Sequence, residues 1–426
     1  MEAYATALTY AIPGFVLLII IEAIAGRIMK KNINNSEDVI SSLSSGMTNT
    51  LKSVLGLSVI IVSYEWMEGK IGIFDIQSNL WLYIIAFIGI DFAGYWSHRF
   101  NHEINLFWNR HIVHHSSEEF NLSCALRQEI SAIVGIYFFL YIPMALIGVP
   151  AQIVAITAPI HLFAQFWYHT RLIDRMGLLE HILVTPSHHR VHHAINEKYI
   201  DKNYAAIFIV WDKWFGTFQE ELPDEEPVYG TLKPAHTWNP VIINYMHFWS
   251  LVKDAFNTKN WWDKIRIWFM PTGWRPDDLK VKDPRMEYPV YERKKYHTKL
   301  SGSLLTWSWV QFIITNALLY HLLTQVGTLS FTDIGLYSFF LFFSIFGFTS
   351  LMDVHKIGLW FEWFKSFIGL SILYVSGTWF GLEDIIPFGK MLIIAYLSLA
   401  PILATYFIFI DRKSEAFTYP TDMEAA

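Results

Sequence analysis

Long apolar segments alternate with short polar ones along most of this chain, a pattern that predicts helices crossing a membrane. A helix needs about 20 apolar residues to cross roughly 30 Å of hydrocarbon. Two segments are weaker than the rest, because the second contains Ser and Gly and the eighth carries Glu362 and Lys365. The nine segments cover residues 8–26, 47–66, 80–97, 131–148, 151–168, 303–323, 333–352, 358–380 and 390–410. We therefore expect an all-α, multi-pass transmembrane bundle of about nine spans.

The polar stretches divide this bundle into three zones. We expect membrane helices in residues 1–168, a cytoplasmic or interfacial segment in residues 169–300, and further membrane helices in residues 301–426. The middle zone is rich in Trp, and Trp and Tyr favour the interface between lipid headgroups and water. An amphipathic helix around residues 245–270 is therefore expected to lie in that interface, with direct contact to a lipid substrate as the alternative role of its aromatic residues.

The distribution of positive charge predicts an orientation, because short cytoplasmic loops are enriched in Lys and Arg. The first ten residues contain neither, whereas Arg27, Lys30 and Lys31 follow the first segment and Arg412 and Lys413 follow the last. With nine spans, this places the N-terminus outside and the C-terminus inside. We expect an integral protein of a bacterial inner membrane or the endoplasmic reticulum.

Composition narrows the function classes. The chain is 53% hydrophobic and 17% aromatic, well above a typical soluble domain. Its net charge of −6 and the absence of a basic stripe argue against a nucleic-acid partner. A single cysteine, Cys124, excludes an internal disulfide framework, an iron–sulfur cluster and a cysteine-based zinc site.

Eight of the seventeen histidines form three tight clusters beside the apolar segments. Residues three or four apart share a helix face, so each cluster can aim its imidazoles at one point. Neutral imidazole binds iron, zinc, copper or nickel, and eight such ligands are too many for one ion and suit two. The clusters are His98-x3-His102, His111-x2-His114-His115 and His189-x2-His192-His193. We expect a dinuclear metal site on the cytoplasmic side.

Other polar residues near the clusters have two interpretations. Asp91 lies inside the third segment, and a carboxylate within a membrane span is a candidate functional residue. The alternative is that Asp91 only forms a hydrogen bond to a neighbouring helix. We expect the residues that follow the third cluster to shape the polar zone rather than to touch metal. They are Asn203, Asp212, Gly216 and Thr217.

The clusters sit in recognisable motifs. These are His98-Arg99-Phe100-Asn101-His102-Glu103, His111-Ile112-Val113-His114-His115-Ser116-Ser117, Gln165-Phe166-Trp167-Tyr168-His169-Thr170 and Thr185-Pro186-Ser187-His188-His189-Arg190-Val191-His192-His193. Their order and spacing resemble the fatty acid hydroxylase/sterol desaturase superfamily, whose three histidine boxes bind a non-haem di-metal centre. Within it, the motifs are most similar to those of enzymes that cleave ether lipids.

This resemblance implies site residues and cofactors. It implies the eight histidines as ligands of two iron ions, and His169 as a ninth. His161 and His188 are weaker candidates, and Glu103 would accept a proton or orient a ligand imidazole. The implied reaction is dioxygen-dependent hydroxylation of an ether lipid beside its ether oxygen, which releases a fatty aldehyde. Electrons would come from an external donor, tetrahydrobiopterin or a reductase.

Three alternatives remain beside this interpretation. The nearest is a sterol, carotenoid or fatty-acyl hydroxylase or desaturase that uses an external reductase. A membrane zinc protease is disfavoured because its His-Glu-x-x-His signature is broken at Leu106, four residues after His102. A metal transporter is disfavoured because the expected topology puts every cluster on one side of the membrane.

Overall fold

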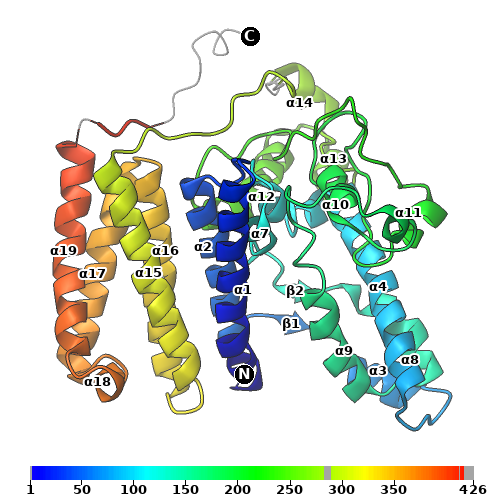
Figure 1. Ribbon diagram of the computed structural model, residues 1–426, viewed down its shortest axis with the longest axis horizontal. Helices are drawn as coiled ribbons and strands as arrows, with labels where there is room; N and C mark the ends of the chain where they lie inside the picture. Colours follow the sequence, from blue (N-terminus) through cyan, green and yellow to red (C-terminus); the bar gives the residue numbers. More distant parts are fainter. Residues whose placement is uncertain (1, 283–288, 412, 417–426) are drawn as a thin grey trace.

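The computed structural model describes residues 2–282, 289–411 and 413–416, and this part of the chain is almost wholly helical (Figure 1). The all-α prediction is therefore confirmed. In the described part the longest helices, of 18 residues or more, are α1 (Glu2–Ile28), α2 (Ser36–Val54), α4 (Leu80–Glu103), α12 (Pro240–Asn257), α15 (Gly302–Gln325), α16 (Phe331–Met352), α17 (Lys356–Ser376) and α19 (Gly389–Phe409).

Shorter helices and one small sheet connect these long ones. The sheet pairs β1 (Val59–Ile60) with β2 (Val134–Gly135) in parallel. The short α-helices are α3 (Tyr64–Ile71), α5 (Asn105–Trp108), α6 (Ile112–His115), α7 (Leu122–Ala125), α8 (Ile142–Ile147), α9 (Ala151–Phe163), α10 (Pro186–His192), α11 (Val210–Phe215), α13 (Trp261–Arg266), α14 (Asp277–Lys282) and α18 (Leu382–Ile385). Two 3₁₀ helices are η1 (Tyr137–Tyr141) and η2 (Gly177–His181).

Four helices in the described residues are long and apolar enough to cross a membrane. They are Tyr4–Ile28, Leu80–Glu103, Phe331–Met352 and Gly389–Phe409. Their positions agree with four of the nine predicted segments, and they support an integral membrane protein.

The prediction of nine spans is not confirmed, and three of its segments are wrong as single helices. The segment at 47–66 contains the end of α2, then β1 and the start of α3, and 131–148 is divided among β2, η1 and α8. The segment at 151–168 forms only the 13-residue α9. A hydropathy pattern cannot distinguish side chains buried in protein from side chains facing lipid. The predicted orientation therefore loses the support that it took from the span count. Arg412, one of the positive charges used to predict that orientation, lies outside the described residues.

The C-terminal helices α15, α16, α17 and α19 pack together into a bundle on one side of the molecule (Figure 1). Its interior contains an ion pair between Glu362 and Lys365, both fully buried. The Lys365 ammonium also donates to Gln311 of α15 and, at 2.9 Å, to the Tyr396 hydroxyl of α19. These bonds explain why α17 carries two charges and still lies inside an apolar bundle.

The other side of the molecule holds α4 against α9, with the C-terminal end of α4 close to α10 (Figure 1). Asn79 caps the start of α4 by accepting from the backbone of Trp81 and Leu82. A tight turn at Gly148 then separates α8 from α9.

Replacing Gly148 by Ala is expected to destabilise the protein by more than about 2 kcal/mol. Gly148 has φ +85°, and an added Cβ would lie 1.9 Å from the Phe74 carbonyl oxygen. Gly177 is the matched control, because its φ is +61° but open space surrounds it, so Ala there costs only about 1 kcal/mol. Thermal unfolding of the detergent-solubilised variants measures both. Equal melting temperatures would contradict the steric argument.

Candidate metal centre

The C-terminal end of α4 carries the first two histidines. His98 and His102 are one helical turn apart and therefore lie on the same face. Ile104 then adopts an extended conformation, ends the helix and reverses the chain into α5. This reversal brings α6, with His111 as its N-cap and with His114 and His115 in its single turn, back beside the first pair.

Helix α10 supplies the third cluster from a distant part of the sequence. It begins with Pro186, which suits the first turn because that position needs no backbone N–H donor. His189, His192 and the C-cap His193 are all buried. His169 follows the end of α9, and its Nδ1 lies 3.0 Å from the Gln165 carbonyl oxygen.

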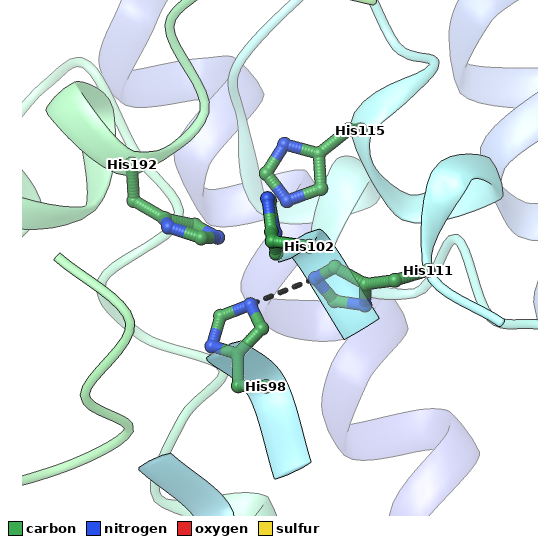
Figure 2. Close-up of side chains that lie close together, drawn as sticks. All are labelled: His98, His102, His111, His115 and His192. Atoms are coloured by element: carbon green, nitrogen blue, oxygen red, sulfur yellow. Dashed lines mark hydrogen bonds between the residues drawn. The ribbon is translucent and has the colours of Figure 1, made fainter. Parts of the chain in front are cut away.

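The structure brings all nine predicted ligands into two compact groups. In each group, one nitrogen from every ring lies within 4.8 Å of the corresponding nitrogen of the others. The first group is His98, His102, His111, His115 and His192, shown in Figure 2. The second group is His114, His169, His189 and His193. The two groups adjoin, because the rings of His115 and His193 stack with centroids 4.3 Å apart.

Backbone carbonyl oxygens fix the tautomers of several rings. His98 Nδ1 lies 2.7 Å from the Tyr204 oxygen, and His192 Nδ1 lies 2.9 Å from the Lys202 oxygen. A carbonyl oxygen only accepts, so the proton belongs on Nδ1 and the Nε2 lone pair is directed into the group. This is the arrangement by which proteins orient metal-binding histidines.

Three of the five nitrogens inside the first group lack a hydrogen-bond partner in the protein. The Nε2 atoms of His102, His115 and His192 are buried without a hydrogen-bond partner. His98 Nε2 lies 2.8 Å from His111 Nε2 (Figure 2). Unpaired buried polar atoms are costly, and a shared cation would satisfy all of them. The residues of this group therefore fit a metal ion.

The second group has the same character. His189 Nε2 lies 2.9 Å from His169 Nε2 and 3.1 Å from His193 Nε2. His114 Nε2 lies 3.3 Å from His169 Nε2, while its Nδ1 faces the Arg127 carbonyl oxygen at 3.3 Å. Four ring nitrogens that converge in this way suit a metal with imidazole ligands.

Burial keeps these rings in the protonation state that binds metal. It holds the pKa of His111, His115 and His192 well below the usual range, and the neighbouring imidazoles lower it further. Burial also lowers the pKa of His169 to about 3. These four rings are therefore neutral at physiological pH, with a lone pair available for a cation.

Two buried carboxylates hold residues 202–208, the segment whose backbone carbonyl oxygens orient His98 and His192. Asp91 accepts from the backbone of Ile207 at 2.9 Å and of Phe208 at 3.0 Å, from the Trp211 indole at 2.8 Å and from His161 at 2.7 Å. Asp91 thus acts as an anchor of this segment, and His161 belongs to that anchor rather than to either histidine group.

Asp212 holds the other end of the same segment. Its carboxylate accepts from the backbone of Tyr204 and Ala205, each at 2.8 Å, and from the Thr217 hydroxyl at 2.6 Å. Asn203 bonds to the carbonyl oxygens of His188 and Gln219. Asn203, Asp212 and Thr217 therefore shape the polar zone, as the sequence predicts, and the carbonyls of Lys202 and Tyr204 reach the histidines as a result.

Glu103 and His188 lie outside both groups. The Glu103 carboxylate accepts from Arg99 Nε at 2.8 Å, and its side chain is 40% exposed. His188 is buried with its Nδ1 3.4 Å from the Thr185 hydroxyl. The catalytic role predicted for Glu103 stays a prediction.

Sequence reasoning missed a buried ion pair beside the second group. Arg127 contacts Asp38 at 2.9 Å, and both side chains are at least 96% buried. The Arg127 guanidinium also donates to the hydroxyl of Ser116, next to His115. The backbone carbonyl oxygen of Arg127 accepts from Nδ1 of His114. The sequence offers no signal for this pair, because Asp38 and Arg127 each lie among other polar and charged residues and are 89 positions apart.

The fold and the site together define a helical membrane protein with two adjoining histidine groups that can each hold a metal ion. The family model described as fatty acid hydroxylase matches residues 83–217, the stretch that contains all nine histidines. No solved structure matches the chain significantly.

Curated relatives extend this similarity. The chain is 39% identical over 268 residues to the alkylglycerol monooxygenase of Homo sapiens, covering 62% of this chain and 59% of the relative. It is 35% identical over 314 residues to that of Xenopus tropicalis, covering 72% of this chain and 69% of the relative. An ornithine lipid hydroxylase, OlsE of Rhizobium tropici, is 27% identical over 135 residues, 32% of this chain and 41% of the relative. The chain spans about three fifths to two thirds of the length of the first two relatives. It belongs to the fatty acid hydroxylase superfamily, in the group of the alkylglycerol monooxygenases.

Proposed function

We propose that this chain is a membrane di-iron monooxygenase that hydroxylates a lipid C–H bond, with ether lipids of the alkylglycerol type as substrates. The observation that carries the proposal is the convergence of nine histidines, six buried and three half-buried, in two adjoining groups. The similarity to alkylglycerol monooxygenases supports the substrate class.

The residues of the chain would hold the cofactor and protect it. The first group offers five imidazoles and the second four, with His98 and His192 oriented by backbone carbonyls. When bound, two iron ions supply the activation of dioxygen that attack on an unactivated C–H bond requires. Burial of the rings excludes water, which would otherwise quench a strong oxidant.

The proposed reaction inserts one oxygen atom of dioxygen at the carbon next to the ether oxygen. The other atom leaves as water, which requires two electrons and two protons from an external donor. The product is a hemiacetal that collapses to a fatty aldehyde and a glycerol derivative. Tetrahydrobiopterin is the proposed donor by similarity alone, and Glu103 is the proposed proton acceptor or ligand-orienting carboxylate.

We also propose that the site lies on the cytoplasmic side and that the polar zone, residues 169–300, covers it there. Positive charge supports this, since Arg27 in the last turn of α1 and Lys30 and Lys31 just after it lie at the same end of the molecule as α10, which carries the third cluster (Figure 1).

A second candidate is hydroxylation of another lipid without loss of its carbon skeleton. The similarity to the ornithine lipid hydroxylase favours it, because that protein's name specifies a different lipid. Such an enzyme would use a protein reductase and would release no aldehyde.

The test is turnover of a 1-O-alkylglycerol by ferrous-loaded protein with dioxygen and tetrahydrobiopterin. We expect a fatty aldehyde that forms only when both dioxygen and the pterin are present. If protein that holds two irons releases no aldehyde, the ether-lipid proposal is wrong. Hydroxylated ornithine lipid or sterol, formed with a reductase, would then support the second candidate.

A further inference from the structure

Helices α12 (Pro240–Asn257) and α13 (Trp261–Arg266) expose a cluster of large apolar side chains, most of them aromatic. The sequence predicts one amphipathic helix around residues 245–270, and the structure has two, because the chain is extended at Thr258. On α12 the buried residues Ile243, Leu251 and Asp254 form one face. Phe256 is 82% exposed and Trp261 79% exposed. The exposed set on these two helices and just after α13 is Ile242, Tyr245, Phe248, Trp249, Phe256, Trp261, Trp262, Ile265 and Phe269, which we call the aromatic helix pair.

Basic side chains accompany these aromatic rings. The Lys253 ammonium lies 5.9 Å from the centroid of the Trp249 ring, and the Lys264 ammonium lies 5.6 Å from that of Trp261. Trp rings with adjacent Lys are typical of the boundary between hydrocarbon and lipid headgroups, where the ring contacts apolar chains and the ammonium contacts phosphates. The chemistry of this surface therefore fits phospholipid headgroups.

The aromatic helix pair is fastened to the end of a membrane helix. The Asn105 side chain donates to the carbonyl oxygens of Ile267 at 3.0 Å and Trp274 at 3.1 Å. The Thr272 hydroxyl donates to the carbonyl oxygen of His102, and its backbone N–H donates to that of Glu103 at 3.1 Å.

These contacts determine the depth of the surface. Helix α4 is long and apolar enough to span a membrane, and its last residues are His102 and Glu103. The segment after α13 contacts their backbone directly, so the exposed aromatic side chains lie near the level at which the span ends. That level is the headgroup layer.

We propose that the aromatic helix pair lies in the phospholipid headgroup layer as an in-plane anchor and holds the histidine groups at that depth. A lipid with a polar head and an apolar tail then meets the site without leaving the bilayer. The proposed membrane contact does not depend on the proposed function. Only the statement about how the substrate reaches the site rests on the proposed function.

The contact is tested with full-length protein in vesicles of phosphatidylcholine and phosphatidylglycerol. Trp262→Cys is labelled with an environment-sensitive fluorophore, and Phe256→Cys provides a second position. The native Cys124 is fully buried, and burial raises its thiol pKa to about 12, so it does not react under mild conditions. Glu197→Cys, in the exposed turn after α10, is the matched control.

We expect lipids brominated in the acyl chain to quench the labels at 262 and 256 and to leave the label at 197 bright. Aqueous iodide should do the reverse. Labels at 262 and 256 that iodide quenches as efficiently as the control would overturn the proposal. Shielding from both quenchers would also overturn it, because a second copy or another protein would then cover the surface.

The link to the site is tested with the double variant Trp261→Ser and Trp262→Ser. We expect an increased KM for a bilayer-embedded lipid, with kcat and bound metal unchanged. An unchanged KM would overturn the positioning role of the anchor. If the unmodified protein turns over no lipid at all, the proposed function fails while the quenching result still decides the membrane contact.

Discussion

Replacing any one of His102, His115 and His192 by Ala is expected to abolish lipid turnover and to lower the metal bound per chain. These three rings have buried Nε2 atoms without a protein partner, and they come from α4, α6 and α10. Each variant therefore removes one ligand of the first group, contributed by a different helix. Metal analysis of purified protein and aldehyde release measure the two effects.

His188→Gln is the matched control for these variants. His188 is buried and adjoins His189 in α10, yet it belongs to neither histidine group. This variant should retain its metal and most of its activity. The di-metal proposal would be wrong if two of the three Ala variants kept full turnover.

Replacing Asp91 by Ala is expected to destabilise the protein by about 3–5 kcal/mol, the range for removing one partner from a buried charged contact. The change leaves the backbone N–H groups of Ile207 and Phe208, the Trp211 indole and His161 without their acceptor. The Lys202–Phe208 segment then loosens, and the carbonyl oxygens that orient His98 and His192 move.

Thermal unfolding and the absorption spectrum of cobalt-substituted protein distinguish the two consequences for Asp91→Ala. A lower melting temperature reports the lost contacts, and an altered cobalt spectrum reports disturbed ligand geometry. Asp75→Ala, an exposed carboxylate shortly before α4, should change the stability by less than about 0.5 kcal/mol. An unchanged spectrum in Asp91→Ala would show that the segment does not position the histidines.

The histidine site was largely predictable because helical spacing carries direct geometric information. His98 and His102, His111 and His115, and His189 and His193 are each four residues apart, and each pair stays within one group. The division into groups was harder to predict, because the adjacent His114 and His115 point about 100° apart on a helix. As a result, His114 joins the second group and His192 the first.

The membrane helices were less predictable than the site. Hydropathy identified α1, α4, α16 and α19 because their apolar stretches are long and nearly uninterrupted. It failed at 47–66, where the apolar residues beyond α2 form β1 and part of a short helix. It also could not reveal backbone partners such as the carbonyls of Lys202 and Tyr204, since any residue type supplies the same oxygen.

The buried ion pair of α17 has a consequence for how the protein enters the membrane during synthesis. Charged side chains in hydrocarbon are energetically unfavourable. Without its packing partners, α17 would expose the charged side chains of Glu362 and Lys365 to hydrocarbon. Its polar partners Gln311 and Tyr396 come from α15, made earlier, and α19, made later. The polar contacts of this ion pair are therefore complete only once α19 has been synthesised, so we expect the C-terminal bundle to close late in synthesis.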